Sequence, residues 1–244
     1  MSQDQAKKLC ECLKKANKAY ALTGAGMSTE SGIPDFRSPG TGIWNEIDPI
    51  KYATRDVLLN EPEKFYEYTF KRFMTLLDKK PNDGHYVLSE LEKDGFINGI
   101  ITQNIDGLHQ EAGSKNVWEV HGNVKKGQCL KCNTSYPFDD LVKKVKENTV
   151  PLCDNCQGML RPNVVLFGDP MPDDFFQIAT ELKNNSDFLL VVGTSLQVYP
   201  VAGLAELGVP MGIINLDSTP YDINAEVTIK SKCSEALKDI QEFI

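Results

Sequence analysis

Short apolar runs alternate with amphipathic stretches along most of the chain. The runs at 19–22, 97–102, 117–120, 164–167, 188–192 and 211–215 consist largely of aliphatic and aromatic residues, as is typical of buried strands. Apolar residues at helical spacing predict helices over 5–18, 61–79, 84–93, 173–184, 200–207 and 233–243. Because strands and helices alternate, the pattern predicts βαβ units and a parallel sheet covered by helices on both faces.

Each predicted strand stops at a cluster of small or polar residues. In an open parallel sheet, ligands bind beyond the carboxyl ends of the strands, so these clusters should converge on one site. The clusters are Gly24–Gly26, Gln103–Asp106, His121, Gly193–Ser195 and Asn215.

The first turn, Thr23-Gly24-Ala25-Gly26, is half of a dinucleotide-binding fingerprint, in which glycines let the backbone approach a pyrophosphate. Thr29 stands where the third glycine is expected, and no acidic residue marks a second strand end about 20 residues later. By itself the turn is therefore also compatible with a plain strand-to-helix connection. It does not match the pattern of a standard Rossmann dehydrogenase.

Two Cys-x2-Cys pairs, Cys129/Cys132 and Cys153/Cys156, lie about twenty residues apart. This spacing favours a tetrahedral zinc site with four thiolate ligands, a structural site because no coordination position stays open. An iron or iron–sulfur centre and reactive thiols are the alternatives. The total of seven cysteines is odd, which argues against a disulfide framework. The stretch 125–160, with one helix near 138–147, reads as an inserted zinc module.

The chain has three histidines. His85 at a helix start and His109 after a strand end favour structural roles. His121 ends a short strand directly before the zinc insertion, where two subdomains would meet, so catalysis as a general base and a structural role both stay open. Asn104 and Asp106 suit the binding of ribose hydroxyls and a carboxamide, or ordinary loop capping.

Composition narrows the classes of function. With 26 basic and 34 acidic residues the net charge is −8, which argues against direct nucleic-acid binding and leaves room for basic peptides. The 41% hydrophobic and 25% charged composition is that of a folded protein. No apolar run approaches the roughly 20 residues of a membrane span, and the N-terminus lacks a signal pattern. We expect a cytoplasmic, monomeric protein that does not bind membranes.

Together these motifs resemble the sirtuins, the NAD-dependent protein lysine deacylases, and most of all the compact bacterial and archaeal members. The resemblance covers about residues 15 to 235. In family order, it rests on Gly24–Arg37, Thr102–His109, His121-Gly122, the four cysteines, Val165–Asp169, Gly193–Ser195 and Ile214–Asp217.

The resemblance implies an α/β fold with two parts. A Rossmann-like, NAD-binding parallel-sheet domain would comprise 1–35, 84–122 and 161–244. A smaller domain would combine a cofactor loop and helical insertion at 36–83 with the zinc-binding module at 123–160. NAD as co-substrate and an acyl-lysine peptide would enter the cleft between them from opposite sides.

It also implies roles for residues. His121 would be the general base, and Asn104, also catalytic, would contact the nicotinamide-side ribose with Gln103. Asn215 would hold the adenine-side ribose. The other NAD contacts would be Gly24, Ala25, Gly26, Thr29, Gly193, Thr194 and Ser195 near the phosphates, Ile33, Ile105 and Asp106 around nicotinamide, and Asp35, Phe36 and Arg37 in the mobile loop. Cys233 falls either near adenine or in the core.

The implied reaction transfers the acyl group to ADP-ribose and releases nicotinamide, free lysine and O-acyl-ADP-ribose. The peptide would lie as an added strand between Phe167-Gly168-Asp169 and Gln197-Val198-Tyr199, with Val165, Phe167 and Val198 lining the lysine tunnel. Asp169 stands where many members carry Glu, and Pro170 removes an N–H from this peptide-binding segment.

The acyl preference follows from one departure from the family pattern. Members that favour acidic acyl groups carry Tyr-x2-Arg on the helical insertion, and here Tyr66 is followed by Thr69. Burying an acyl carboxylate without a cation is costly, so a neutral acyl group such as acetyl is expected, although Arg72 could attract an acid weakly. A mono-ADP-ribosyltransferase and a non-catalytic NAD- and zinc-binding module are the alternative functions. The set of Asn104, Asp106 and His121 favours deacylation.

Overall fold

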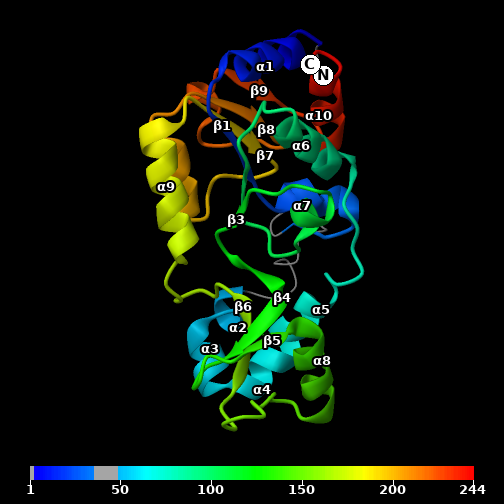
Figure 1. The fold of residues 1–244 in the computed structure, drawn as a ribbon, viewed down its shortest axis with the longest axis vertical. Coiled ribbons are helices and arrows are strands. Elements are labelled where there is room, and N and C mark those ends of the chain that lie inside the picture. The colour runs from blue at the N-terminus through cyan, green and yellow to red at the C-terminus, as the bar shows by residue number, and fades with distance from the viewer. Residues whose placement is uncertain (1–2, 36–48) are drawn as a thin grey trace.

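The computed structural model describes residues 3–35 and 49–244. Its larger part is a six-stranded parallel sheet with the order β3-β2-β1-β7-β8-β9. The chain thus runs outward from β1 in one direction and from β7 in the other, which is the doubly wound arrangement (Figure 1). The strands are β1 (Ala19–Thr23), β2 (Ile100–Thr102), β3 (Val117–Glu119), β7 (Phe188–Val192), β8 (Met211–Ile214) and β9 (Val227–Ile229).

Helices cover both faces of this sheet because successive strand residues point to opposite sides. In β1, Ala19 and Ala21 face one hydrophobic core, and Tyr20 and Leu22 face the other. The first core packs against α1 (Gln3–Lys15), α6 (Asp83–Lys93) and α10 (Cys233–Gln241). The second packs against α9 (Asp173–Asn185) and the 3₁₀ helix η4 (Val201–Glu206). Both chain ends lie on the first side, where α1 packs on α10 (Figure 1).

The smaller part is built on a three-stranded antiparallel sheet with the order β5-β4-β6. Its strands are β4 (Gly122–Cys129), β5 (Ser135–Pro137) and β6 (Leu160–Val164), and α8 (Phe138–Glu147) packs on them. The helical insertion comprises α2 (Pro49–Tyr52), α3 (Arg55–Asn60), α4 (Pro62–Lys64), the π-helix η3 (Phe65–Phe70) and α5 (Lys71–Met74). Phe65, Tyr66 and Phe70 of η3 share one core with Phe138 and Leu141 of α8. The helical insertion and the cysteine segment thus form a single small unit.

Several expected elements differ from those observed. The strand expected at 164–167 is β6, which ends at Val164, and the helix expected over 61–79 is divided among α4, η3 and α5. The helix expected at 200–207 is a 3₁₀ helix, and the sequence patterns missed β4, β5 and β9. The remaining short elements are the 3₁₀ helices η1 (Ala25–Ser31) and η5 (Asp222–Asn224) and the helix α7 (Leu108–Glu111). In the described ranges no helix has the length and apolarity to cross a membrane.

Candidate active site

Two glycine turns interlock where the strand order reverses, between β1 and β7. The Gly26 N–H donates to the Gly193 carbonyl at 2.8 Å, and a Cβ added at Gly24 would lie 2.6 Å from Thr194 Cβ. Gly193 has φ +63°, and a Cβ there would lie 2.3 Å from the Met27 nitrogen. These contacts require glycine, because no other residue combines the backbone conformation with so close an approach. The expected Gly-rich site therefore lies at the topological switch point.

Two amide side chains that follow β2 reach across to these turns. Gln103 Nε2 donates to Thr194 Oγ1 at 3.0 Å. Asn104 is buried, and its Nδ2 donates to the Gly24 carbonyl at 3.0 Å and to Ser28 Oγ at 3.1 Å. Residues that lie about eighty positions apart in sequence are thus fixed within one hydrogen-bond network.

Asp106 is tied to the same network. Its carboxylate accepts from Ser28 Oγ at 2.7 Å and from the Leu108 N–H at 3.0 Å. Burial raises the pKa of Asp106, and the two hydrogen bonds act in the opposite direction. Ser28 lies within the motif Gly24–Arg37 and bridges Asn104 and Asp106 through its hydroxyl.

His121 lies in the short connection between β3 and β4, with its imidazole against the backbone that follows β2. His121 Nδ1 lies 3.0 Å from the Gln103 carbonyl oxygen. A carbonyl can only accept, so in the neutral ring Nδ1 carries the proton and Nε2 is left as an acceptor. Burial lowers the pKa of His121, and the bond to Gln103 opposes that shift. The ring is therefore a neutral base that is oriented by the residue next to Asn104.

The other residues expected to bind NAD lie around this centre. Thr29 Oγ1 donates to the Gly26 carbonyl at 2.9 Å, and Ile33 is buried with its N–H on the Ser28 carbonyl. Asn215 follows β8 and donates through Nδ2 to the Asp217 carbonyl at 2.9 Å. Ala25, Asp35, Ile105 and Ser195 are half-buried, and Phe36 and Arg37 lie outside the described residues.

Cys233 at the start of α10 lies beneath the glycine turn, with Sγ 3.7 Å from the Gly26 carbonyl oxygen. It is buried, and burial raises the pKa of its thiol to about 12. Cys233 therefore lies in the core, as one of the two sequence interpretations predicts, and its proximity to adenine stays a prediction.

The four cysteines of the two Cys-x2-Cys pairs converge at one end of the small sheet. Their sulfur atoms all lie within 4.8 Å of one another, and two of the cysteines are buried. Four thiolates at this spacing fit a tetrahedral Zn²⁺ ion and leave no position open for substrate. Tyr136 on β5 donates its hydroxyl to Cys153 Sγ at 3.2 Å, so the cluster also has an outer hydrogen-bond partner.

Comparison with known proteins decides the family. The model of the Sir2 family matches residues 24–200. The chain belongs to the Sir2 family. An NAD-dependent protein deacetylase 2 of Caldanaerobacter subterraneus is 52% identical over all of this chain and 97% of its own length. An NAD-dependent protein deacetylase of Thermotoga maritima is 40% identical, with 97% of each chain covered.

Solved Sir2 structures share the whole architecture. One complex of Sir2 with a deacetylated p53 peptide and 3'-O-acetyl ADP-ribose aligns with a TM-score of 0.91 at 39% identity, covering 97% of both chains. A complex of Sir2 with a p53 peptide and NAD⁺ aligns with a TM-score of 0.87 at 38% identity, again over 97% of both chains. The expected family and fold class are therefore confirmed.

In this Sir2 chain the segment expected to bind peptide is held against the helical insertion. The Phe167 N–H donates to the Ala53 carbonyl at 3.1 Å, and the Arg55 N–H donates to the Phe167 carbonyl at 2.9 Å. The side chain of Phe167 is 45% exposed. Both backbone groups of Phe167 are thus occupied, so an added peptide strand must pair with its neighbours.

Asp169 holds the backbone of the same segment through its carboxylate. Its carboxylate forms a two-point ion pair with Arg161, at 3.0 and 2.6 Å, and also accepts the Leu166 N–H at 2.9 Å. No sequence pattern singles out Arg161, because its pairing with Asp169 forms only where the chain leaves β6. In the second segment expected to contact the peptide, Val198 is half-buried and Tyr199 is exposed. The Tyr199 hydroxyl lies 2.6 Å from Glu206 Oε1.

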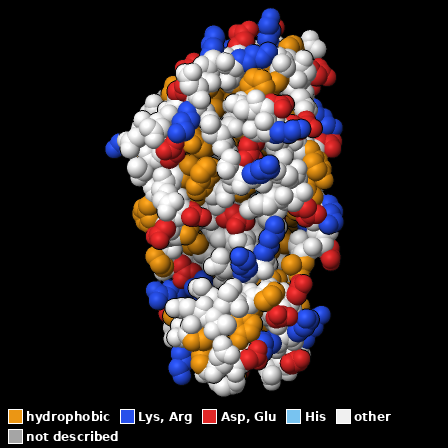
Figure 2. Space-filling view, in the orientation of Figure 1, with side chains coloured by type: hydrophobic (Ala, Val, Ile, Leu, Met, Phe, Trp, Pro, Cys, Tyr) orange, Lys and Arg blue, Asp and Glu red, His pale blue; other side chains and the backbone are white. Residues whose placement is uncertain are grey.

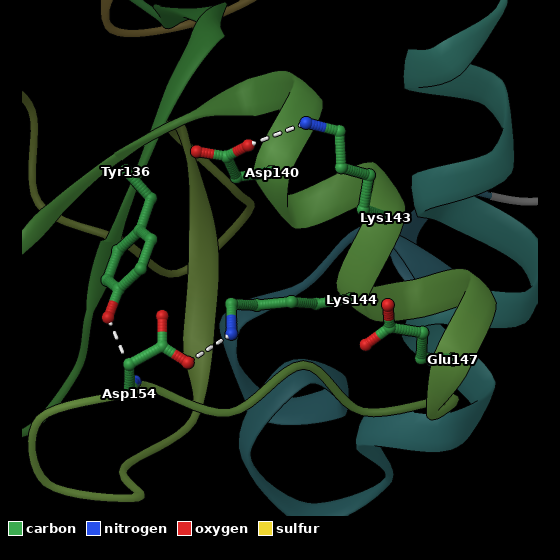
Figure 3. Close-up of a pocket in the computed structure, with 6 residues that line it drawn as sticks. All are labelled: Tyr136, Asp140, Lys143, Lys144, Glu147 and Asp154. Carbon is green, nitrogen blue, oxygen red and sulfur yellow. Dashed lines mark hydrogen bonds and ion pairs between the residues drawn. The ribbon is translucent and has the colours of Figure 1, made fainter.

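A polar cavity of about 270 Å³ on the zinc module is separate from the strand ends. It is lined by Tyr136, Asp140, Lys143, Lys144, Glu147 and Asp154 (Figure 3). Its two lysines pair with Asp140 and Asp154, so most of its charge is neutralised internally. On the face of the molecule in Figure 2, acidic and basic side chains are likewise intermixed. Neither this cavity nor the mixed surface charge in Figure 2 indicates a second reactive site.

Proposed function

We propose that this Sir2-family protein is an NAD-dependent protein lysine deacetylase that produces nicotinamide, free lysine and O-acetyl-ADP-ribose. The network that joins His121, Gln103, Asn104, Ser28 and Asp106 to the glycine turns is the observation that carries the proposal. It places a neutral base and polar anchors at one end of the sheet. Relatives at 39–52% identity over nearly the whole chain are named deacetylases or deacylases, which supports the same activity.

The roles follow from the hydrogen bonds. When bound, NAD supplies an electrophilic sugar carbon and a nicotinamide leaving group. The glycine turns leave room for its phosphates, and Asn104 and Asp106 are held rigidly enough to fix the sugar and the carboxamide. Positioning of this kind lowers the barrier because the translational and rotational entropy of the reactants is lost on binding, before the chemical step. His121 Nε2 accepts the proton of a ribose hydroxyl.

The peptide would add as a strand beside Gly168, because the backbone of Phe167 already pairs with the helical insertion. On the other side it would approach Val198 and Tyr199. Backbone pairing gives affinity with little demand on the peptide sequence. Val165, whose N–H donates to the His121 carbonyl at 2.9 Å, connects this segment to the base.

A preference for neutral acyl groups has support from the helical insertion. Tyr66 is buried and donates its hydroxyl to the Leu160 carbonyl, and Thr69 Oγ1 donates to the Tyr52 carbonyl at 2.8 Å. Neither hydroxyl is available to an acyl carboxylate, and position 69 offers no cation. Turnover of succinyl-lysine should therefore fall well below that of acetyl-lysine, by about 100-fold in kcat/KM.

The first test is the turnover of an acetyl-lysine peptide with and without NAD, read by mass spectrometry, for the native protein and His121→Ala. Loss of acetyl that requires NAD, yields O-acetyl-ADP-ribose and disappears in the variant would support the proposal. Zinc content and melting temperature should match between the two proteins, so that a loss of activity is not caused by a loss of folding.

An ADP-ribosylated protein product would indicate a transferase. NAD binding without consumption would indicate a non-catalytic module. Comparable turnover of acetyl- and succinyl-lysine would contradict the acyl preference.

Monomeric state and cytoplasmic location stay predictions. Light scattering of the purified protein would test the first, and fractionation of the native cells would test the second.

A further inference from the structure

Two buried histidine rings lie against each other, tilted, beside the ends of β1 and β2. His85 on α6 and His109 on α7 are 0% and 1% exposed, and their ring centroids lie 4.8 Å apart at an interplanar angle of 54°. The roles proposed above for substrate contact use neither ring. Two apolar side chains of similar volume would fill the same space at a lower desolvation cost, so packing alone does not explain the pair.

The proton positions of His85 follow from its partner. The Asn82 N–H donates to His85 Nδ1 at 3.3 Å, as part of the capping box at the start of α6. Nδ1 is therefore an acceptor, and the neutral ring carries its proton on Nε2. Burial lowers the pKa of His85 to about 4, so the neutral form is the one present at neutral pH.

The proton positions of His109 follow from the threonines beyond it. His109 Nε2 lies 2.9 Å from Thr23 Oγ1, whose own proton is donated to Thr102 Oγ1 at 2.9 Å. With that proton used, Thr23 accepts from His109, so His109 also carries its proton on Nε2. Thr102 Oγ1 in turn accepts the Asn104 N–H at 3.1 Å.

These assignments leave one unused donor on one ring and one unused acceptor on the other. Within the described chain, His85 Nε2 and His109 Nδ1 are buried nitrogens with no hydrogen-bond partner. By the assignments above the first carries a proton and the second carries a lone pair, so His85 has an unused donor and His109 an unused acceptor, in rings whose centroids lie 4.8 Å apart. From His109 the donors point through Thr23 to Thr102 Oγ1, which accepts the Asn104 N–H from its other side.

We propose that His109, oriented by His85, is a positioning residue that holds Asn104 in its reactive conformation through the hydroxyls of Thr23 and Thr102. Asn104 has three such anchors, two at its side chain and one at its backbone N–H. The inference rests on the proposed function for its kinetic consequence. Its structural content, the tautomers and the position of Asn104, stands apart from any activity.

The first test reads the tautomers directly. Long-range ¹H–¹⁵N NMR spectra of the uniformly labelled full chain should show Nε2–H tautomers for both His85 and His109 at pH 7. The amide resonance of Asn104 should shift in His109→Leu and return toward its native position in His109→Gln. A proton on Nδ1 of His109 would overturn the proposal, and so would an Asn104 amide resonance that does not change in His109→Leu. These readouts do not require turnover, so they hold even if the proposed function fails.

The second test reads the kinetics. His109→Leu keeps the volume and removes the donor, and kcat should fall roughly 10- to 100-fold while KM for the acetyl peptide stays within about twofold. His109→Gln can place an amide N–H near the position of Nε2, and it should recover most of kcat. Adding Thr23→Val to His109→Leu should cost little more, because both changes break the same link.

Leu91→Ala is the matched control, because this buried residue of α6 belongs to the apolar core. It should lower the melting temperature and leave kcat unchanged. If kcat follows the melting temperature across all variants, or if His109→Gln recovers nothing, His109 is merely structural. Wild-type protein without NAD-dependent turnover would instead refute the proposed function.

Discussion

Arg161 and Asp169 form a buried two-point ion pair, with side chains 11% and 8% exposed, directly beneath the segment expected to bind peptide. Asp169 also accepts the Leu166 N–H, so the pair fixes the backbone from Leu166 to Asp169. The Asp169 carboxylate is thus part of the framework of this segment.

Breaking this pair should damage peptide binding more than NAD binding. Arg161→Met leaves the buried Asp169 carboxylate with only the more distant Arg55, whose Nε lies 3.9 Å from Asp169 Oδ1, which should cost on the order of 3 kcal/mol in the free energy of unfolding. KM for the acetyl peptide should rise at least about tenfold, because the loop loses its anchor. Urea unfolding and peptide titration at saturating NAD measure the two effects. The double variant Arg161→Met/Asp169→Asn should recover part of the stability, and equal damage to NAD affinity would contradict this assignment.

Gly193 should tolerate no side chain. With φ +63° and a Cβ position 2.3 Å from the Met27 nitrogen, Gly193→Ala forces the two glycine turns apart. NAD affinity should fall beyond detection by calorimetry, and the loss of stability should exceed the cost of the backbone conformation alone. Gly208 is the matched control, with φ +80° and no atom within 4 Å of its Cβ position. Gly208→Ala should cost about 1–2 kcal/mol and leave NAD affinity intact.

Stability should fall as the pH is lowered from about 6.5 to 4. Burial depresses the pKa of His85 to about 4 and that of His109 well below its usual value. The unfolded chain therefore takes up protons before the folded one does, and stability is lost as the pH falls through this window. For His85 alone the effect is on the order of 3 kcal/mol.

Urea unfolding at half-unit pH intervals would measure this slope, and His85→Leu should flatten it. Asp106 has a raised pKa and the opposite dependence, so the comparison of the two proteins isolates the histidine. An unchanged slope in His85→Leu would show that other groups dominate.

Tyr136 should slow the loss of zinc. Its hydroxyl donates to Cys153 Sγ, so Tyr136→Phe removes an outer hydrogen bond from a ligand without opening the core. Metal affinity should fall roughly 10- to 100-fold, and transfer of zinc to a chromophoric chelator should accelerate. Tyr86→Phe, at a tyrosine that is 47% exposed, is the matched control and should not change the transfer. Identical transfer rates in the two variants would exclude a role for Tyr136.

The sequence by itself determined the main sheet except for its edge strand β9, and it indicated the chemistry of the site. Runs such as Phe188–Val192 are apolar at every position because helices cover both faces of the parallel sheet, and that pattern needs no partner to be recognised. The glycine turn and the paired cysteines carry their chemistry in local spacing. Motif order then identified the family, and with it the residues now seen around the switch point.

Only the tertiary structure decided the contacts between distant segments. β9 is three residues long and β4 lacks apolar alternation, so each is a strand only because a neighbour supplies its hydrogen bonds. Arg161 meets Asp169, and His109 meets Thr23 and His85, through the folding of separate elements, and nothing local in the sequence encodes those encounters. The sequence could assign a structural role to a lone histidine. The fold decided that two of them would share one buried contact beside Asn104.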